Sequence, residues 1–122
     1  MNIRKAKKGD YSKICKIARL YSKKIVEPLP KYSKYYVVEE NKKIAGCAAL
    51  EIYSSKIAEI RSVAVLPKYN KKGYGTELIK RCLREIEKKK IHEVFVVTSI
   101  PDYFKKLGFD FCQGEKFILF KK

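Results

Sequence analysis

The stretch from Glu59 to Lys90 constrains the fold most, because it joins a strand pattern to a helix pattern through a glycine-containing loop. The run Ile57–Leu66 is rich in β-branched residues and stops at Pro67, which is typical of a strand. The loop at 70–75 contains two glycines, where a backbone can turn or let a ligand approach closely. Apolar residues then recur at the spacing of one helix face, at Tyr74, Leu78, Ile79, Cys82, Leu83 and Ile86.

A loop of this kind at the start of a helix can hold phosphate. The first N–H groups of a helix have no internal acceptor, and the helix dipole adds partial positive charge there. Lys68, Lys71 and Lys72 raise the local positive field. The loop lacks the G-x-x-x-x-G-K-S/T pattern and the third glycine of G-x-G-x-x-G. On loop chemistry alone, a solvated helix start therefore stays an equal alternative to a phosphate site.

At these residues the chain resembles the GNAT superfamily of acetyl-CoA-dependent N-acetyltransferases. The family pattern is Q/R-x-x-G-x-G/A after a strand that ends in hydrophobic-Ala-Val. It stands here as Val63-Ala64-Val65-Leu66-Pro67 followed by Asn70-Lys71-Lys72-Gly73-Tyr74-Gly75. Two further blocks, G-C-A-A-L at 46–50 and Y-F-K-K-L-G-F at 103–109, follow the family in order and spacing. Among GNAT groups the chain is most similar to amino-acid acetyltransferases of the N-acetylglutamate synthase type. The resemblance implies acetyl-CoA as the cofactor and an α/β fold, in which helices flank a central mixed β-sheet.

Composition bounds the organisation of the chain. Its 122 residues suffice for a single domain over residues 1–122, and 46% hydrophobic residues fit a folded protein. No apolar run approaches the ~20 residues that span a bilayer, and the charged start at Met1–Lys5 has no apolar stretch behind it. We therefore expect a cytoplasmic protein without a membrane partner. The four cysteines lack C-x-x-C spacing and His92 is the only histidine, so we expect no metal site.

The formal net charge of +16 comes from lysines spread along the whole chain. Nucleic-acid binding, attraction of an anionic small molecule and a lysine-rich surface like that of high-temperature proteins are competing explanations. Arginine, which makes bidentate contacts with phosphates and bases, is scarce beside lysine. That scarcity argues against specific nucleic-acid recognition, although nonspecific binding stays open, as does a homodimer.

The remaining pattern predicts further elements around the central unit. A helix should begin at Gly9-Asp10, with Asp10 as its N-cap, and end at the prolines of Glu27–Pro30. Its apolar stripe is Ile14, Ile17, Ala18, Tyr21 and Ile25. Pro101 should open a short helix to Leu107 that Gly108 closes. The expected strands are Met1–Ala6, Tyr35–Glu39, Ile44–Tyr53, His92–Thr98 (buried on both faces), Phe111 and Lys116–Phe120. The span from Glu27 to Lys34 is too short for the helix that the resembled family carries there, in a region that usually shapes the acceptor site.

Glu59 is the candidate general base. An amine that attacks a thioester must lose a proton, and a carboxylate facing the cleft is the usual acceptor. By resemblance, Glu59 stands in an A-E-I run where histone acetyltransferases of the superfamily carry their base. Strand alternation places Glu59 on one face with Arg61, Val63 and Val65, barring a bulge of the kind that family members often have. Pairing of Glu59 with Arg61 or a lysine at a strand edge is the structural alternative.

The resemblance assigns further residues to the cofactor. The backbone N–H of Val63 would donate to the oxyanion of the tetrahedral intermediate, and the Val63 and Val65 backbone would pair with pantetheine like an added strand. Asn70 replaces the Arg or Gln usual at the first loop position, and Lys71 and Lys72 would compensate in charge. The full set expected to bind the cofactor is Val63, Ala64, Val65, Asn70, Lys71, Lys72, Gly73, Tyr74, Gly75, Thr76 and Phe104.

Other side chains are expected on the acceptor side. Many GNAT proteins carry a general-acid Tyr where Phe104 stands here, so the thiolate would leave unassisted unless Tyr103 contributes. Packing in the core or at its rim is the alternative role of Tyr103. Arg61 would meet the carboxylate of an acidic acceptor, and Thr98 and Ser99 would donate hydrogen bonds. Close relatives often carry Arg where Ser99 stands, which weakens an assignment to glutamate.

Together these residues predict an acetyl-CoA-dependent N-acetyltransferase that acts on the primary amine of a small molecule, an amino acid above all. Acetylation of a protein N-terminus or a lysine is the second enzymatic interpretation. A non-catalytic basic module that binds CoA or nucleic acid is the third.

Overall fold

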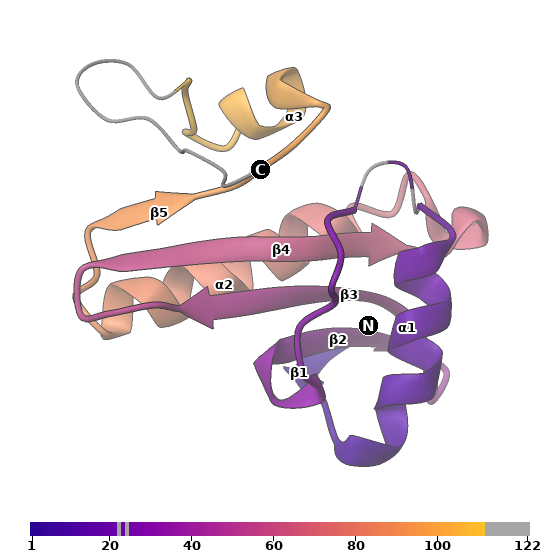
Figure 1. Cartoon of the computed structure of the whole chain (residues 1–122). Helices are drawn as coiled ribbons and strands as arrows, with labels where there is room; N and C mark the ends of the chain where they lie inside the picture. The colour runs from indigo at the N-terminus through magenta and orange to yellow at the C-terminus, as the bar shows by residue number, and fades with distance from the viewer. Residues whose placement is uncertain (22, 24, 112–122) are drawn as a thin grey trace.

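The computed structural model describes residues 1–21, 23 and 25–111, and its helices and strands follow the order β1-α1-β2-β3-β4-α2-β5-α3 (Figure 1). The strands are β1 (Asn2–Lys5), β2 (Tyr35–Glu40), β3 (Lys43–Ile52), β4 (Ile57–Val65) and β5 (Glu93–Phe95). The helices are α1 (Tyr11–Arg19), α2 (Tyr74–Lys88) and α3 (Pro101–Lys105), with short 3₁₀ turns at Lys8–Asp10, Tyr32–Lys34 and Pro67–Tyr69. The expected strand Lys116–Phe120 lies outside the described residues.

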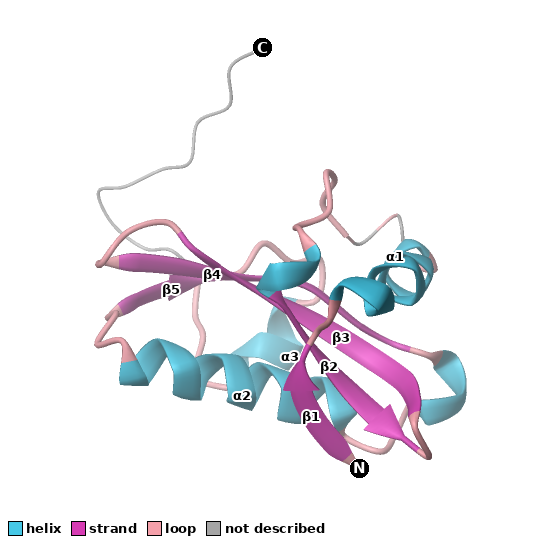
Figure 2. Cartoon of the chain, turned by 90° about the horizontal axis from the view of Figure 1, so that it is seen from below, coloured by secondary structure: helices cyan, strands magenta, loops and turns pink. Residues whose placement is uncertain are grey.

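The five strands form one mixed sheet in the order β1-β2-β3-β4-β5. Neighbours from β1 to β4 pair antiparallel, and β5 joins β4 in parallel. Helix α2 runs along one face of the sheet and α1 covers part of the other, as Figures 1 and 2 show. This arrangement confirms the expected fold class, a mixed sheet flanked by helices.

Each long helix buries an apolar stripe against its own face of the sheet. Leu78 of α2 is fully buried in one core, and Ile14 and Ile17 of α1 are fully buried in the other. Val37 and Val38 are adjacent on β2 and enter opposite cores, because successive side chains of a strand point to opposite faces. Each such side chain contributes ~1.5–3 kcal/mol when it leaves water. Each face of the sheet is therefore stabilised by its own apolar core, one under α2 and one under α1.

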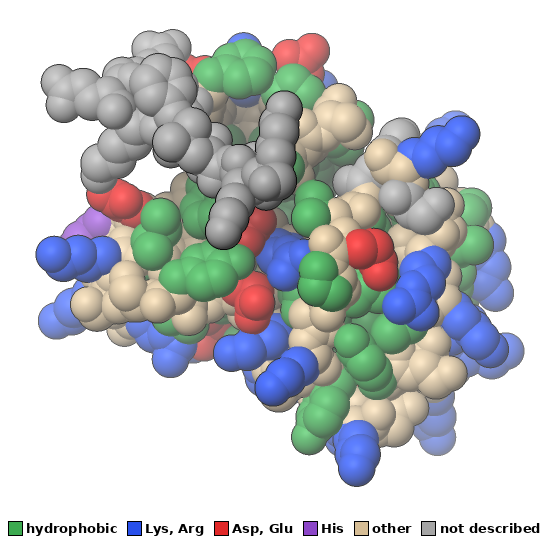
Figure 3. Space-filling view, viewed as in Figure 1, with side chains coloured by type: hydrophobic (Ala, Val, Ile, Leu, Met, Phe, Trp, Pro, Cys, Tyr) green, Lys and Arg blue, Asp and Glu red, His purple; other side chains and the backbone are tan. Residues whose placement is uncertain are grey.

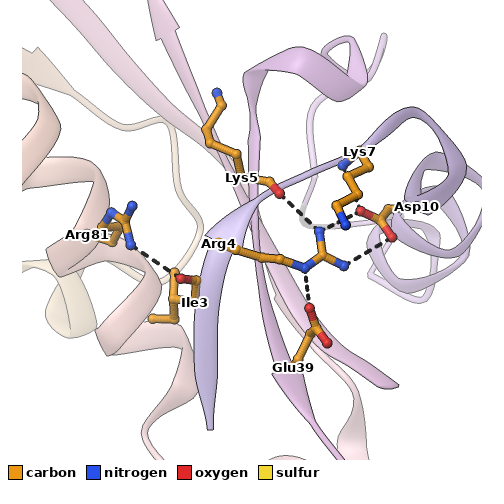
Figure 4. A network of polar contacts seen from close by, with 7 residues as sticks. All are labelled: Ile3, Arg4, Lys5, Lys7, Asp10, Glu39 and Arg81. Atoms are coloured by element: carbon orange, nitrogen blue, oxygen red, sulfur yellow. Dashed lines mark hydrogen bonds and ion pairs between the residues drawn. The ribbon is translucent and has the colours of Figure 1, made fainter. Parts of the chain in front are cut away.

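Arg4 ties the first strand to the approach of α1 (Figure 4). Asp10 stands at the expected N-cap position, but its carboxylate does not cap α1. It accepts instead from the Lys7 N–H at 2.7 Å and from Arg4 Nη1 at 2.8 Å, while Arg4 also donates to Glu39 on β2. The hydrogen bond from Arg4 lowers the pKa of Asp10. The expected capping role is therefore replaced by an ion-paired clamp between β1, β2 and the start of α1.

Helix α1 is shorter than its sequence pattern predicts. It ends at Arg19 rather than at the prolines, and Leu20 just beyond it is 58% exposed. Tyr21 and Ile25 still pack against the core on the α1 side, although they lie outside the helix. The reason is tertiary: the Tyr21 hydroxyl donates to the Val65 carbonyl on β4 at 2.6 Å, which holds the chain across the end of the sheet.

A β-bulge interrupts the pairing of β3 with β4. Cys47 pairs with Ala64, but Ala49 pairs with Arg61, so β4 carries one extra residue over this length. Ser62 takes up the irregularity with a φ of 53°, in the left-handed region that few non-glycine residues adopt.

The bulge changes which face the end of β4 presents. Ile60 packs in the core under α2, so Glu59 and Arg61 on either side of it face away from α2. Val63 and Val65, beyond the bulge, pack toward the α2 core again. The shared face of Glu59, Arg61, Val63 and Val65 was expected only in the absence of a bulge, and it does not form because the extra residue at Ser62 shifts the alternation.

Strand β5 is short and lies beside β4 alone among the described residues. It pairs with β4 at Ile57, Ala58 and Glu59, and the chain leaves the sheet after Phe95. Val97 is 54% exposed. The prediction of a strand buried on both faces over His92–Thr98 was wrong, because the apolar run turns away from β4 before it is covered.

Gly108 closes the region of α3 as predicted. Its φ is 96°, the Phe109 N–H donates to Phe104 O at 3.1 Å and the Gly108 N–H to Lys105 O at 3.1 Å, which together make a Schellman motif. The regular helix ends at Lys105, short of the expected end, and Phe111 is not in a strand.

No helix within the described ranges is long and apolar enough to cross a membrane.

Candidate active site

A cleft opens where β5 leaves β4. The two strands pair only from Ile57 to Glu59, whereas β4 continues to Val65. A cavity of about 200 Å³ lies along this further length of β4, between residues 60–65 and residues 96–100. Over the described part of the chain, the edge of β4 beyond Glu59 therefore has no neighbouring strand on the β5 side.

The backbone of β4 offers hydrogen-bonding groups to this cleft. The Leu66 N–H donates to Ala45 O on the β3 side at 2.8 Å, so the main-chain groups of Val65 and Val63 point to the opposite edge. The Val65 carbonyl accepts the hydrogen bond from Tyr21 there. An extended ligand lying in the cleft would meet Val63 and Val65 as it would meet a neighbouring strand.

The loop after β4 presents free amides beside the cleft. Gly73 has a φ of 76°, which glycine adopts without steric cost. The first helical hydrogen bond joins the Glu77 N–H to Gly73 O at 3.1 Å, so the N–H groups of residues 73–76 have no acceptor within α2. Asn70 lines the cleft, which places this loop at its end. These amides and the dipole of α2 fit an anionic group such as a diphosphate.

The loop lysines differ in what they contact. The Lys72 ammonium lies 2.8 Å from a Glu40 carboxylate oxygen, and this hydrogen bond raises the pKa of Lys72 and lowers the pKa of Glu40. Lys72 and Lys68 also lie over the Tyr69 ring, at 5.5 and 5.0 Å from its centroid. Lys71 has an exposed side chain with no ion pair within the described residues. An anionic ligand can therefore approach the Lys71 ammonium without breaking an ion pair to Glu40 or a contact with the Tyr69 ring.

Helix α3 brings aromatic side chains to the cleft. The Tyr103 hydroxyl lies 2.7 Å from Thr76 Oγ1 at the start of α2. A Cβ added at Gly75 would lie 3.4 Å from the same hydroxyl, which is van der Waals contact, so α3 packs closely on the start of α2. Phe104 is 7% exposed and meets the Tyr103 ring edge-on, with the ring centroids 5.3 Å apart. Tyr103 therefore links the cleft wall to the loop, and Phe104 contributes an apolar lining.

Glu59 lies on the face of β4 opposite Val63 and does not line the cleft. It is 8% exposed, accepts a hydrogen bond from the Tyr53 hydroxyl at 2.5 Å and lies 4.0 Å from Arg61 Nε. Glu51 stands opposite it on β3. Figure 3 shows acidic and basic side chains gathered over these strands. Burial, and then the hydrogen bond to Glu59, raise the pKa of Tyr53 to about 12, so its hydroxyl remains a donor at neutral pH.

The cleft brings together most of the side chains expected from the sequence. Those in its lining are Arg61, Val63, Ala64, Val65, Asn70, Thr98, Ser99, Tyr103 and Phe104. Thr98 Oγ1 accepts the Ile100 N–H at 2.9 Å, so its hydroxyl hydrogen remains to donate. Tyr74 is only 6% exposed, which leaves its backbone rather than its side chain for a ligand. Within the described ranges, no group of His, Cys, Asp and Glu side chains could hold a metal ion.

The predicted site lacked several side chains that line the cleft or contact Glu59, among them Tyr21, Ile25 and Tyr53. Tyr21 and Ile25 line the cleft, although the sequence pattern places them in a buried helix stripe. Tyr53 contacts Glu59 from the turn after β3, and no motif marks it. The contact between Tyr53 and Glu59 depends on the pairing of β3 with β4, which residue types alone do not predict.

Known proteins resemble the chain over nearly its whole length. The family model described as "Acetyltransferase (GNAT) family" matches residues 4–109. An uncharacterized N-acetyltransferase of Chlorobaculum tepidum is 31% identical over 122 residues, covering 94% of this chain and 79% of that protein. The amino-acid acetyltransferase of Mycobacterium tuberculosis is 29% identical over 121 residues, covering 92% of this chain and 70% of that protein.

Solved structures share the fold. A Mycobacterium tuberculosis protein in complex with CoA and NLQ has a TM-score of 0.87 at 27% identity, covering 97% of this chain and 76% of that chain. N-acetylglutamate synthase from Neisseria gonorrhoeae, complexed with coenzyme A and L-arginine, has a TM-score of 0.81 at 25% identity. That match covers 92% of this chain but 28% of the synthase, so the likeness concerns one part of the larger enzyme.

Proposed function

Because the chain belongs to the GNAT family of acetyltransferases, we propose that it moves the acetyl group of acetyl-CoA to the primary amine of a free amino acid. Acetyl transfer from acetyl-CoA is the activity of the family, and our proposal concerns the acceptor, a free amino acid. The amino-acid acetyltransferase of Mycobacterium tuberculosis, similar over most of both chains, supports this acceptor class. The observation that carries the proposal is the open edge of β4 beside the free amides of α2.

Residues of β4 and the loop would hold acetyl-CoA. The N–H groups of residues 73–76, with Lys71 nearby, suit the diphosphate, and the exposed backbone of Val63 and Val65 suits the amide-bearing pantetheine arm. When bound, acetyl-CoA supplies a thioester carbonyl for direct attack by the amine. Phe104 would pack against the acyl end, because it is the buried aromatic side chain in the lining.

The Val63 N–H is the proposed oxyanion donor. The bulge at Ser62 fixes the direction of this amide toward the cleft, so no reorganisation is needed as charge develops. A preorganised donor of this kind contributes ~3–4 kcal/mol to barrier reduction. Tyr103 and Ser99 would contact the reacting substrates from the opposite wall.

Glu59 is the proposed proton acceptor. It lies across β4 from Val63, so we propose that the amine proton reaches its carboxylate through water. The Tyr53 hydroxyl donates to one carboxylate oxygen and Arg61 Nε lies 4.0 Å from the group, and these contacts hold the carboxylate in place.

Thiol release from acetyl-CoA with single amino acids tests the acceptor class. We expect one or a few free amino acids to give release, with an acetylated product in the mass spectrum, and the matched N-acetylated amino acids to give none. Acetylation confined to peptide N-termini or lysine side chains would replace the proposed acceptor with a protein. Absence of turnover together with nucleic-acid binding of steep salt dependence would point to a binding module.

Substitution of Glu59 by Gln tests its role. Glu59→Gln should lower kcat/KM by ~10²-fold or more at low pH, where the amine is mainly protonated, and leave the affinity for acetyl-CoA unchanged. Glu87→Gln, which removes an exposed carboxylate of α2, is the control. Unchanged turnover of the Glu59 variant across the pH range would remove this residue as the base.

A further inference from the structure

The segment that follows α1 crosses the sheet without regular secondary structure. Residues 25–31 belong to no helix or strand, and Val26, Glu27 and Pro28 are exposed. In Figure 1 this part of the chain passes over β4 on its way to β2, and Ile25 lines the cleft. A segment with so little burial keeps one conformation only where other groups hold its backbone.

Arg61 holds this backbone. Its Nη2 donates to Val26 O at 3.1 Å and to Pro28 O at 2.8 Å. Its other nitrogens face the carboxylates of Glu51 and Glu59 at 3.9 and 4.0 Å, which are ion-pair distances and too long for hydrogen bonds. The shortest contacts of the guanidinium are therefore with the carbonyls of the segment, and the side chain is only 15% exposed.

The position of Arg61 in β4 places its guanidinium beside the backbone of residues 26–28. It immediately precedes the bulge at Ser62, on the face away from α2, where the segment crosses. A guanidinium carries its donors in one planar fork, which can serve two carbonyls and face two carboxylates at once. A lysine ammonium has the charge without that geometry.

A second contact fastens the start of the same segment. The Tyr21 hydroxyl donates to Val65 O at 2.6 Å, so the chain is tied to β4 on both sides of Ile25. Tyr21 and Ile25 form one wall of the cleft, and the residues at 96–100 form the other. The distance between these walls depends on the two ties.

We propose that Arg61 is a positioning residue, which fixes residues 26–28 against β4 and so holds the adjacent Ile25 in the wall of the cleft, instead of binding the acceptor carboxylate. The proposal revises the substrate-binding role expected of Arg61 from the sequence. Its kinetic consequence rests on the proposed function, whereas its structural consequence does not.

Kinetics with paired acceptors separate the two roles. Arg61→Gln and Arg61→Lys should each raise KM about tenfold for the preferred amino acid and by the same factor for its carboxamide, with KM for acetyl-CoA changed less than about twofold. Arg19→Gln is the matched control, since it removes an exposed ion pair of 3.7 Å to Glu27 on the same segment. An effect confined to the carboxylate-bearing acceptor, or rescue by Arg61→Lys, would make Arg61 a direct ligand and overturn the proposal.

Hydrogen exchange tests the wall without turnover. In the protein without substrate, the Ile25 amide, which donates to Tyr21 O at 3.1 Å, should exchange at least about tenfold faster in both Arg61 variants than in the wild type, with α2 amides unchanged. The Arg19→Gln protein should match the wild type. Unchanged exchange of the Ile25 amide in a folded Arg61 variant would overturn the proposal, and Arg61→Lys serves if Arg61→Gln does not fold. If no amine is acetylated, the proposed function is wrong. The hydrogen-exchange measurement would still decide whether Arg61 positions the segment, because it needs no turnover.

Discussion

Replacing Gly73 by alanine isolates the conformational requirement of the loop before α2. Gly73 has a φ of 76° and a ψ of 16°, and an added Cβ would meet no atom within 4 Å, so the change causes no clash. The left-handed conformation costs an L-residue ~1–2 kcal/mol. The smaller freedom of the unfolded chain offsets ~0.4–1 kcal/mol of that cost. Gly73→Ala should therefore lower the free energy of unfolding by about 1 kcal/mol.

Urea unfolding followed by circular dichroism measures this change, and the midpoint of thermal unfolding should fall by roughly 4 °C. Gly9→Ala is the matched control, because Gly9 also has open space around it but does not adopt the left-handed conformation. That variant should be neutral or stabilised by up to ~1 kcal/mol. Gly73→Asn should recover part of the loss, since asparagine tolerates the left-handed region. Equal stability of the Gly73→Ala and Gly9→Ala proteins would refute the reasoning, because the loop would then not require the left-handed conformation that frees its amides.

The other predictions concern the proton acceptor, the N-terminal clamp and the cofactor loop. Tyr53→Phe removes the hydroxyl that donates to the Glu59 carboxylate at 2.5 Å and fixes its position, so kcat/KM should fall about tenfold with the affinity for acetyl-CoA unchanged; undiminished kcat/KM would separate Tyr53 from the proton acceptor. Asp10→Asn should destabilise the protein by about 1 kcal/mol at neutral pH. Because Arg4 lowers the pKa of Asp10, its contribution is present above the unfolded value of ~3.9 and is lost as pH falls through the lower folded value. Urea melts of wild type and variant should thus converge as the pH falls below ~3.9, and a difference constant with pH would contradict the clamp. Gly73→Pro should weaken coenzyme A binding more than about tenfold in calorimetry, because proline cannot adopt this φ and lacks the N–H; undiminished affinity would place the cofactor elsewhere.

The strand, loop and helix from Ile57 to Lys88 were predictable because their signals are local. The β-branched run ends at Pro67, the helix stripe begins at Tyr74, and a glycine stands where the backbone turns left-handed. Gly108 was predictable for the same reason, since a helix end favours glycine whatever surrounds it. Local chemistry thus placed the loop between the strand and the helix, whereas the resemblance to the GNAT superfamily marked it as a cofactor site.

The faces and partners of the site depend on long-range pairing that residue types do not encode. Ser62 becomes a bulge only because β3 and β4 meet in this register, and the bulge separates Glu59 from Val63. Arg61 and Lys72 carry charges that suit a ligand, but the fold brings Pro28 O and a Glu40 carboxylate within hydrogen-bonding distance of them. The sequence therefore predicts which charges are near the site better than it predicts what they bind.

A crystal structure of the protein with coenzyme A is the most direct measurement of the central claim. The account predicts the diphosphate within roughly 2.7–3.2 Å of N–H groups of residues 73–76, with the pantetheine arm alongside the backbone of Val63 and Val65. Electron density for the coenzyme at another surface, with the space between β4 and residues 96–100 left vacant, would contradict it.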